Sequence, residues 1–322
     1  MSDWLIYTGN AREPHDGVDR LPPPPPWRAF DGGPPLPVPD GDSGNRHQAT
    51  AYRPSDDAVR QVNAALYLRR PLLVTGPPGT GKSTLAYAVA HELRLGPVLH
   101  WPITSRATLR DGLYQYDPLT RLYAASRETG TDDIGRYIRL GALGTALLPH
   151  DRPRVLLVDE IDKSDIDLPN DLLTIFEKGE YEIPELARLA EPTADVLTAD
   201  TGGARVTVTG GRVRCAAFPL VVMTSNGERE FPPAFLRRCV TLELRQPSDE
   251  RELAAIVREH LGDLADRSED LVRRFLARAA NGTLATDQLL NAVYLCRHAD
   301  AADRHDLADR LMPYLTGTAD DD

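Results

Sequence analysis

Short aliphatic runs alternate with segments of helical period from residue 51 onward. In residues 56–69 the apolar positions Val59, Val62 and Leu66 recur at helical spacing, and Pro71 ends the segment. Continuous aliphatic strands separated by helices are typical of a parallel sheet covered on both faces. We therefore expect an α/β fold with a central parallel five-stranded sheet, whose strands lie at 72–76, 98–101, 155–160, 220–226 and 240–244.

The strand pattern stops after Pro247, and only segments of helical period follow. We expect helices at 249–261, 268–280, 286–298 and 303–315, with Gly262 as the stop of the first and Asn281 and Gly282 as the stop of the second. The pattern predicts an α/β core at 51–247, a small all-helical lid at 248–316 and an acidic tail at 317–322.

Residues 1–50 form a proline-rich N-terminal extension. Ten of the 27 prolines lie there, and the block at 22–26 favours extended polyproline II geometry. Trp4 and Trp27 also lie in this extension, whereas disordered segments are usually poor in aromatic residues. We expect an arm that docks on its own core or on a partner, with a plain spacer as the alternative.

Composition and charge narrow the class of protein. The 322 residues include 41% hydrophobic residues, enough for a sizeable core, and the net charge of −11 repels phosphate backbones. Nucleic acid is therefore not expected as the main direct ligand, although a local basic groove stays open. The scattered Cys215, Cys239 and Cys296 fit buried thiols in a reducing cytoplasm. No apolar run approaches the roughly 20 residues needed to cross a bilayer, so no membrane span is predicted.

Residues 76–84, GPPGTGKST, contain the phosphate-binding pattern of Gly, four residues and Gly-Lys-Ser. They lie between a predicted strand and a predicted helix, where glycines let successive amide groups face phosphates and the helix presents its positive end. Lys82 is one of only three lysines among 37 basic residues, and we expect it to reach the β- and γ-phosphates. A glycine-rich turn with a surface lysine is the alternative.

Asp159 and Glu160 end a predicted buried strand, at the sheet edge where open α/β sheets bind ligands. We expect Ser83 and Asp159 to hold Mg²⁺ and Glu160 to polarise the attacking water. The predicted nucleotide-binding residues are Gly76, Pro77, Pro78, Gly79, Thr80, Gly81, Lys82, Ser83, Thr84 and Asp159.

The order of four motifs resembles that of the AAA+ ATPases. GPPGTGKST, VLLVDEID (155–162), VVMTSN (221–226) and PPAFLRRC (232–239) are similar to the Walker A, Walker B, sensor 1 and arginine-finger motifs of that family. Within the family the chain looks most like the MoxR group. Residues 112–126 resemble the β-hairpin inserted in helix 2 of that group, and residues 172–185 resemble the helix, glycine and strand after its Walker B. A Gly-Gly turn independently predicts a hairpin at 205–216.

The resemblance implies roles for further residues. Asn226 would be sensor 1, and at least one of Arg237 and Arg238 would reach the γ-phosphate of an adjacent subunit, with local salt bridges as the alternative. The predicted catalytic residues are Lys82, Glu160, Asn226, Arg237 and Arg238. The chain departs from the family at sensor 2, where Thr286 and Asp287 replace an arginine; Arg278 and Arg297 stay open as substitutes.

The resemblance implies Mg²⁺-dependent ATP hydrolysis in a ring of subunits, expected to be a hexamer, that remodels a partner protein. The partner would often carry a von Willebrand factor A domain. Two alternatives stay open: an ATP-controlled switch or scaffold, and the NTPase subunit of a nucleic-acid-directed restriction or defence system. Positioning and charge stabilisation dominate phosphoryl transfer, and an arginine supplied by a neighbour contributes about 10³ to 10⁵ in rate.

Overall fold

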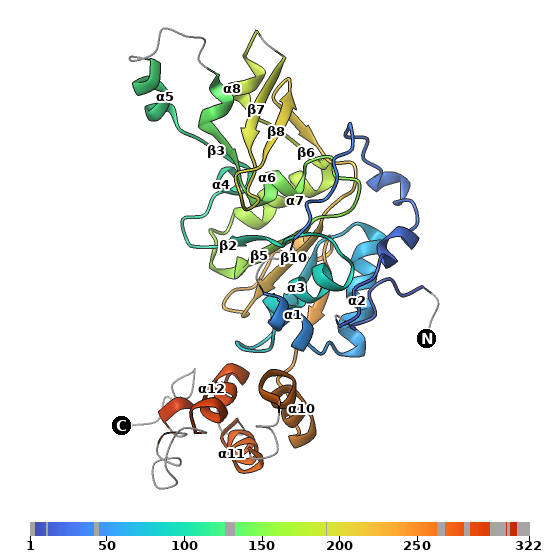
Figure 1. Cartoon of the computed structure of the whole chain (residues 1–322), viewed down its shortest axis with the longest axis vertical. Helices are drawn as coiled ribbons and strands as arrows, with labels where there is room; N and C mark the ends of the chain where they lie inside the picture. The colour runs from blue at the N-terminus through green and yellow to red at the C-terminus, as the bar shows by residue number, and fades with distance from the viewer. Residues whose placement is uncertain are drawn as a thin grey trace.

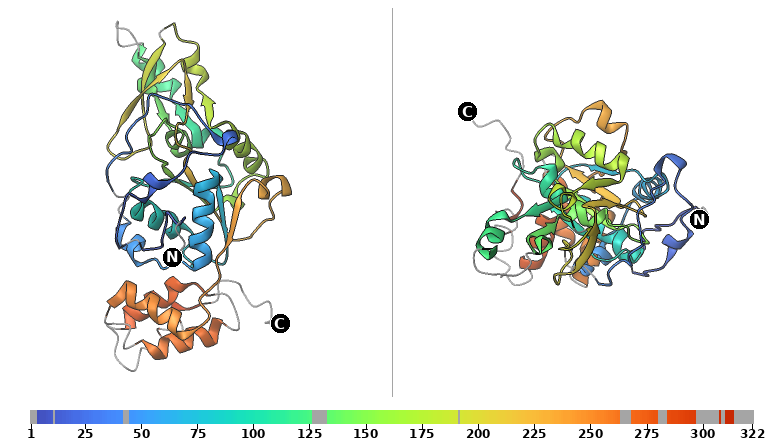
Figure 2. Two further views of the ribbon diagram at one scale, coloured as in Figure 1. Left: turned by 90° about the vertical axis from the view of Figure 1, so that its right-hand side faces the viewer. Right: turned by 90° about the horizontal axis from the view of Figure 1, so that it is seen from above.

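The computed structural model describes residues 4–10, 12–41, 45–125, 133–190, 192–262, 268–279, 284–296, 307 and 310–313. Figure 1 shows three parts stacked along the long axis: a second β-sheet at one end, the central α/β core, and the helical lid at the other end. The side view in Figure 2 shows the same order. Across these ranges no helix is long and apolar enough to cross a membrane.

The central sheet has five strands in the order β11-β1-β10-β5-β2, and all of its pairs are parallel. This confirms the predicted sheet. The strands are β1 (Leu72–Thr75), β2 (Leu99–Pro102), β5 (Val155–Asp159), β10 (Leu220–Ser225) and β11 (Val240–Glu243). The aliphatic runs of β1, β5 and β10 are almost completely buried, because helices cover both faces of the sheet.

Alternate residues of β1, β5 and β10 belong to different cores. Leu72 and Val74 pack with α2 (Asp56–Leu68) and α3 (Lys82–Glu92), whereas Leu73 packs with α6 (Ala142–Ala146) and α7 (Leu168–Lys178) on the other face. Helix α2 begins where Ser55 accepts a hydrogen bond from the amide of Ala58 (3.2 Å). Packing of α3 against β1 in one of these cores places the loop that joins them.

A second sheet of six strands lies beyond the core, in the order β3-β4-β7-β8-β9-β6 (Figure 1). Its strands are β3 (Tyr114–Tyr116), β4 (Ile138–Leu140), β6 (Glu180–Glu182), β7 (Thr193–Leu197), β8 (Arg205–Thr209) and β9 (Arg212–Arg214). Strands β8 and β9 form a hairpin at the predicted turn, where Gly210 and Gly211 both have positive φ (58° and 67°). Helix α7, Gly179 and β6 follow one another within the stretch 172–185.

The stretch 112–126 does not form the expected β-hairpin by itself. It contributes strand β3 and helix α5 (Pro118–Ala125), and the antiparallel partner of β3 is β4. Asp117 accepts hydrogen bonds from the amide (2.9 Å) and hydroxyl (2.6 Å) of Thr120, which favours a helix start, and Pro118 fits the first helical position. The chain therefore begins a helix at Pro118 and does not continue as the second strand of a hairpin. Ser126 lies outside the described residues.

The lid contains α10 (Glu250–Leu261), α11 (Glu269–Ala279) and α12 (Thr286–Cys296). They enclose a separate core that includes Leu253, Phe275 and Leu289. Helix α10 ends at Gly262 (φ 58°), as predicted. The second predicted stop, most of the fourth predicted helix and the acidic tail lie outside the described residues.

The N-terminal arm packs on its own core, so it is not a plain spacer. Ile6 and Tyr7 are buried against α2, where the side chain of Asn63 hydrogen-bonds the amide groups of both and the carbonyl of Tyr7. Farther on, the buried guanidinium of Arg28 donates to the carbonyl of Phe176 at the end of α7. Figure 1 shows the arm running along the core towards the second sheet. Trp27, one of the two tryptophans of the arm, is 75% exposed.

The remaining elements are short. They are η1 (Gly17–Arg20), η2 (Pro26–Arg28), α1 (Arg46–Ala51), α4 (Leu109–Leu113), η3 (Ile134–Tyr137), η4 (Ile161–Lys163), α8 (Pro184–Ala187) and α9 (Pro233–Leu236).

Candidate active site

The glycine-rich loop at residues 76–83 joins the carboxyl end of β1 to the start of α3. Gly76 has φ +145°, and a Cβ there would lie 2.2 Å from the carbonyl oxygen of Leu244. Gly79 has φ +75° and is packed equally tightly. Only glycine tolerates such backbone geometry together with such close approach. The loop therefore turns sharply and delivers the amide end of α3 to the sheet edge.

Lys82 begins α3, and its ammonium group folds back over the loop. Its Nζ donates to the carbonyl oxygens of Gly76 (2.7 Å) and Pro77 (2.8 Å), beside which Thr80 Oγ1 also donates to Pro77 (2.9 Å). Burial lowers the pKa of Lys82, and the nearby carboxylates of Asp162, Asp159 and Glu160 oppose that shift. The ammonium is thus held at the mouth of the loop, where phosphate oxygens can replace its carbonyl partners.

Asp159 ends β5 and receives three side-chain contacts. Ser83 Oγ (2.7 Å) and Thr224 Oγ1 (2.6 Å) both donate to its Oδ1, and His100 Nε2 lies 3.3 Å from Oδ2. Burial alone would raise the pKa of Asp159, but these hydrogen bonds hold it at about 2. A hydroxyl and an ionised carboxylate side by side are the hard oxygen donors that suit Mg²⁺. Ser83 and Asp159 therefore fit the metal predicted from the sequence.

Glu160 lies in the left-handed region (φ 60°), which is unusual for a residue other than glycine. Its amide donates to Thr224 Oγ1 (2.8 Å), and its half-exposed carboxylate contacts Lys163 Nζ (2.8 Å) through Oε2. Asn226 Nδ2 lies 3.5 Å from Oε1. Glu160 and Asn226, predicted from separate motifs, therefore meet at one edge of the sheet.

Asp162 fixes the loop that carries Asn226. Its buried Oδ2 accepts hydrogen bonds from the amide groups of Asn226 (2.9 Å) and Glu228 (3.1 Å). These hydrogen bonds hold the backbone of Asn226 against the turn after β5, which also carries Glu160. The backbone therefore sets the distance between Asn226 and Glu160.

The two predicted finger arginines lie at the opposite edge of the sheet. The amide of Val240 donates to the carbonyl of Pro71 (2.8 Å), so the residues just before β11 lie beside the start of β1, whereas the phosphate loop follows its end. Arg238 forms an ion pair with Glu177 and donates to the carbonyl of Ala234. Within the described part of the chain, the exposed guanidinium of Arg237 makes no hydrogen bond or ion pair.

The lid touches the phosphate loop at the start of α12. A Cβ on Gly79 would lie 2.5 Å from the Cβ of Ala285 and 2.8 Å from the amide nitrogen of Thr286. Thr286 is buried there, so a threonine lies beside the loop at the position where the resemblance would place the sensor 2 arginine. Arg297, one of the two suggested substitutes, lies outside the described residues.

Four residues of the site were not predicted: His100, Asp162, Lys163 and Thr224. Each contacts a predicted residue through a hydrogen bond that spans the sheet edge or the turn after β5. The sequence offered a signal for two of them, because Thr224 precedes Asn226 by two positions on a strand and Lys163 is one of only three lysines.

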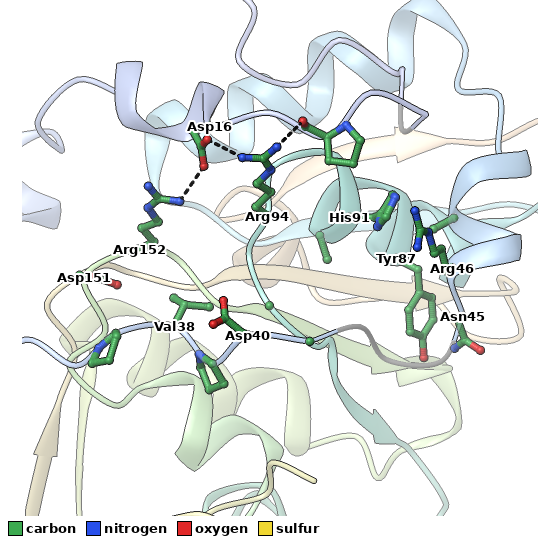
Figure 3. A pocket seen from close by; sticks show the side chains of 17 residues that line it. Asp16, Val38, Asp40, Asn45, Arg46, Tyr87, His91, Arg94, Asp151 and Arg152 are labelled. Atoms are coloured by element: carbon green, nitrogen blue, oxygen red, sulfur yellow. Dashed lines mark hydrogen bonds and ion pairs between the residues drawn. The ribbon is translucent and has the colours of Figure 1, made fainter.

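A separate cavity of about 640 Å³ lies between the arm and the outer side of α3 (Figure 3). Within it, Arg94 contacts Asp16 at 2.7 Å, and Arg152 contacts the same carboxylate at 3.2 Å. None of the lining residues belongs to the phosphate loop, the Asp159 and Glu160 pair, or Asn226. The cavity is therefore distinct from the candidate active site.

Comparison with known proteins identifies a family whose model covers more than half of the chain. The model of the family described as AAA domain (dynein-related subfamily) matches residues 71–239. Replication factor C subunit 2 of Arabidopsis thaliana is 33% identical over 132 residues, which are 38% of this chain and 34% of that protein. The chain thus spans about a third of the length of this curated relative.

Two solved structures show weaker likeness. The Thermotoga maritima RuvB Holliday junction branch migration motor has a TM-score of 0.42 and 14% identity, over 80% of this chain and 68% of that one. Brucella abortus NtrX in complex with ADP has a TM-score of 0.40 and 15% identity, over 85% and 59%. The family match includes every motif of the candidate active site from the phosphate loop to the paired arginines.

Proposed function

Since the chain belongs to the AAA domain family of the dynein-related subfamily and is an AAA+ ATP hydrolase, we propose that it is a MoxR-like member that works in an oligomeric ring and remodels a partner protein complex. The insert carrying β3, α5 and β4 supports the subgroup, because it interrupts the core at the position where the resemblance places an insertion. The site geometry supports a specific division of roles among the residues.

Lys82 and the loop amides bind the β- and γ-phosphates, and Ser83 and Asp159 would hold Mg²⁺, which when bound supplies positive charge beside the phosphates. Glu160 accepts a proton from the attacking water while the water oxygen bonds to the γ-phosphorus. The bond from that phosphorus to its bridging oxygen breaks, and ADP keeps the electron pair. Asn226 orients the water or a γ-phosphate oxygen beside Glu160.

The position of Arg237 carries the proposal of a ring. This exposed arginine lies at the start of β1, while the phosphate loop lies at its end, so it is directed to a neighbouring subunit and not to its own nucleotide. Arg238 is held by Glu177 and supports the segment. We therefore assign the finger acting in trans to Arg237.

Subunit mixing tests this assignment. Lys82→Ala and Arg237→Ala subunits should each be inactive alone, because one lacks the phosphate contact and the other lacks the finger. In an equal mixture about a quarter of the interfaces combine an intact loop with an intact finger, so about a quarter of the wild-type ATPase rate should return. Arg238→Ala is the matched control and should retain activity. If both variants assemble and the mixture stays inactive, the role of Arg237 in trans is wrong.

Helix α5 supports action on another protein. Leu119, Leu122 and Tyr123 are 66%, 67% and 69% exposed at the tip of the molecule, and clustered exposed apolar side chains are typical of protein-binding surfaces (Figure 1). A Glu160→Gln ring loaded with ATP should retain its client during purification from the native cell. The same ring with Leu119→Asp and Leu122→Asp should lose that client. An unchanged set of bound proteins would argue against α5 as the client surface.

A further inference from the structure

We infer that Lys163 is a positioning residue for hydrolysis, which holds the carboxylate of Glu160 towards the attacking water. The inference rests on the proposed role of Glu160 as the base and adds a residue to that site. It is carried by the contacts of Lys163, by the rigidity of the turn on which it lies, and by the use of lysine in this chain.

The carboxylate of Glu160 is held at both oxygens. Lys163 Nζ lies 2.8 Å from Oε2, and Asn226 Nδ2 lies 3.5 Å from Oε1. The amide of Glu160 is held as well, by Thr224 Oγ1. With three anchors, the orientation of the carboxylate is set before substrate arrives, and each of its oxygens keeps a lone pair for a water.

The turn that carries Lys163 is held by a backbone hydrogen bond and by the burial of its neighbouring residues. Lys163 ends the 3-10 turn η4, where its amide donates to the carbonyl of Glu160 (3.0 Å). The preceding Ile161 is fully buried and Asp162 is 5% exposed. The backbone of Lys163 therefore cannot drift relative to Glu160, and only its side chain has freedom.

The surroundings favour a cation at this point. Asp162 and Glu228 lie near the ammonium in addition to Glu160, and the hydrogen bond to Glu160 raises the pKa of Lys163 despite slight desolvation. Without the ammonium, Glu160 would face these carboxylates with no positive partner from its own turn. Repulsion would then turn its carboxylate away from the site.

The choice of lysine is informative in this chain. Arginine supplies 34 of the 37 basic residues, because only Lys82, Lys163 and Lys178 are lysines. Two of the three contact the candidate active site, while Lys178 lies exposed at the end of α7. A compact ammonium can contact one carboxylate oxygen and leave the other to Asn226, whereas a guanidinium fork tends to occupy both.

Lys163→Met tests the inference, because it removes the charge and keeps the length of the side chain. The variant should lower kcat about 10-fold at unchanged KM and unchanged affinity for ATP, since misplacing a reacting group slows chemistry without weakening binding. Lys178→Met is the matched control and should behave as wild type. In a Glu160→Gln background, Lys163→Met should cause no further loss in single-turnover hydrolysis, because it acts only through that carboxylate.

The outcomes separate this inference from the proposed function. If Glu160→Gln hydrolyses ATP at the wild-type rate, the role of Glu160 fails and that of Lys163 fails with it. If Glu160→Gln is inactive but Lys163→Met keeps the wild-type kcat, only the role of Lys163 is overturned. The positioning role is also overturned if Lys163→Met raises KM and leaves kcat unchanged. It is overturned as well if Lys163→Met lowers the single-turnover rate further in the Glu160→Gln background.

Discussion

Replacing Thr224 by valine should damage both stability and catalysis, because one hydroxyl connects the two carboxylates of the site. Thr224 Oγ1 donates to Asp159 Oδ1 (2.6 Å) and accepts from the amide of Glu160 (2.8 Å), and the residue is 1% exposed. Valine has the same shape and can make neither bond, so the change removes the hydrogen bonds without leaving a cavity.

The structure sets the magnitude. A hydrogen bond to an ionised carboxylate is worth roughly 1.5–3 kcal/mol, and leaving a buried amide unsatisfied costs roughly 1–3 kcal/mol. We therefore expect Thr224→Val to lower the free energy of unfolding by about 3 kcal/mol. The released Glu160 backbone should also lower kcat by about 10- to 100-fold, since small displacements of a catalytic group have effects of this size.

Urea unfolding followed by circular dichroism and steady-state ATPase assays on the folded variant measure the two effects. Thr145→Val is the matched control: Thr145 is fully buried on α6, and its Oγ1 accepts from the amide of Ala199 (2.9 Å), remote from the loop. The control should lose stability and keep kcat. The reasoning is refuted if Thr224→Val unfolds within about 0.5 kcal/mol of wild type or hydrolyses ATP at the wild-type rate.

Three further predictions concern the lid, pH and the arm. Gly79→Ala should weaken nucleotide binding in a fluorescence titration, because its Cβ would meet the lid at 2.5 Å; Gly203→Ala, with similar φ (72°) and open space, should not. The pKa of Asp159 is about 2, below the value near 3.9 in the unfolded chain. Ionised Asp159 therefore stabilises the fold fully above about pH 3.9, and this stabilisation is lost as the pH falls towards 2. The stability gap between wild type and Asp159→Asn, about 2 kcal/mol at pH 7, should therefore narrow in urea titrations at pH 3. Asn63→Ala should cost about 3 kcal/mol and expose residues 4–40 to limited proteolysis, because buried Asn63 makes three hydrogen bonds to Ile6 and Tyr7; unchanged cleavage would contradict this.

The paired arginines show how far the sequence could reach. The resemblance implied that at least one of them reaches an adjacent subunit, but both were equal candidates. Only the folded chain distinguishes them, since Glu177 binds Arg238 from a helix 61 positions earlier and leaves Arg237 exposed. The same limit applies to the arm, whose docking depends on Asn63, 56 and 57 positions away from its partners.

Local sequence patterns were enough to predict the α/β sheet, the phosphate loop and the acidic end of β5, because strand burial, glycine geometry and helix starts depend on residues close together in the chain. The way these parts meet depends on the folded chain. Thr224 lies between Asp159 and Glu160, Lys163 contacts Glu160, the lid packs against Gly79, and Arg237 lies at the far edge of the sheet. Most of these contacts join residues that lie 64 or more positions apart in the chain. The contact between Lys163 and Glu160 is local, but it depends on the direction of the lysine side chain in the turn. Packing of the sheet against its helices fixes such distances, and no local pattern encodes them.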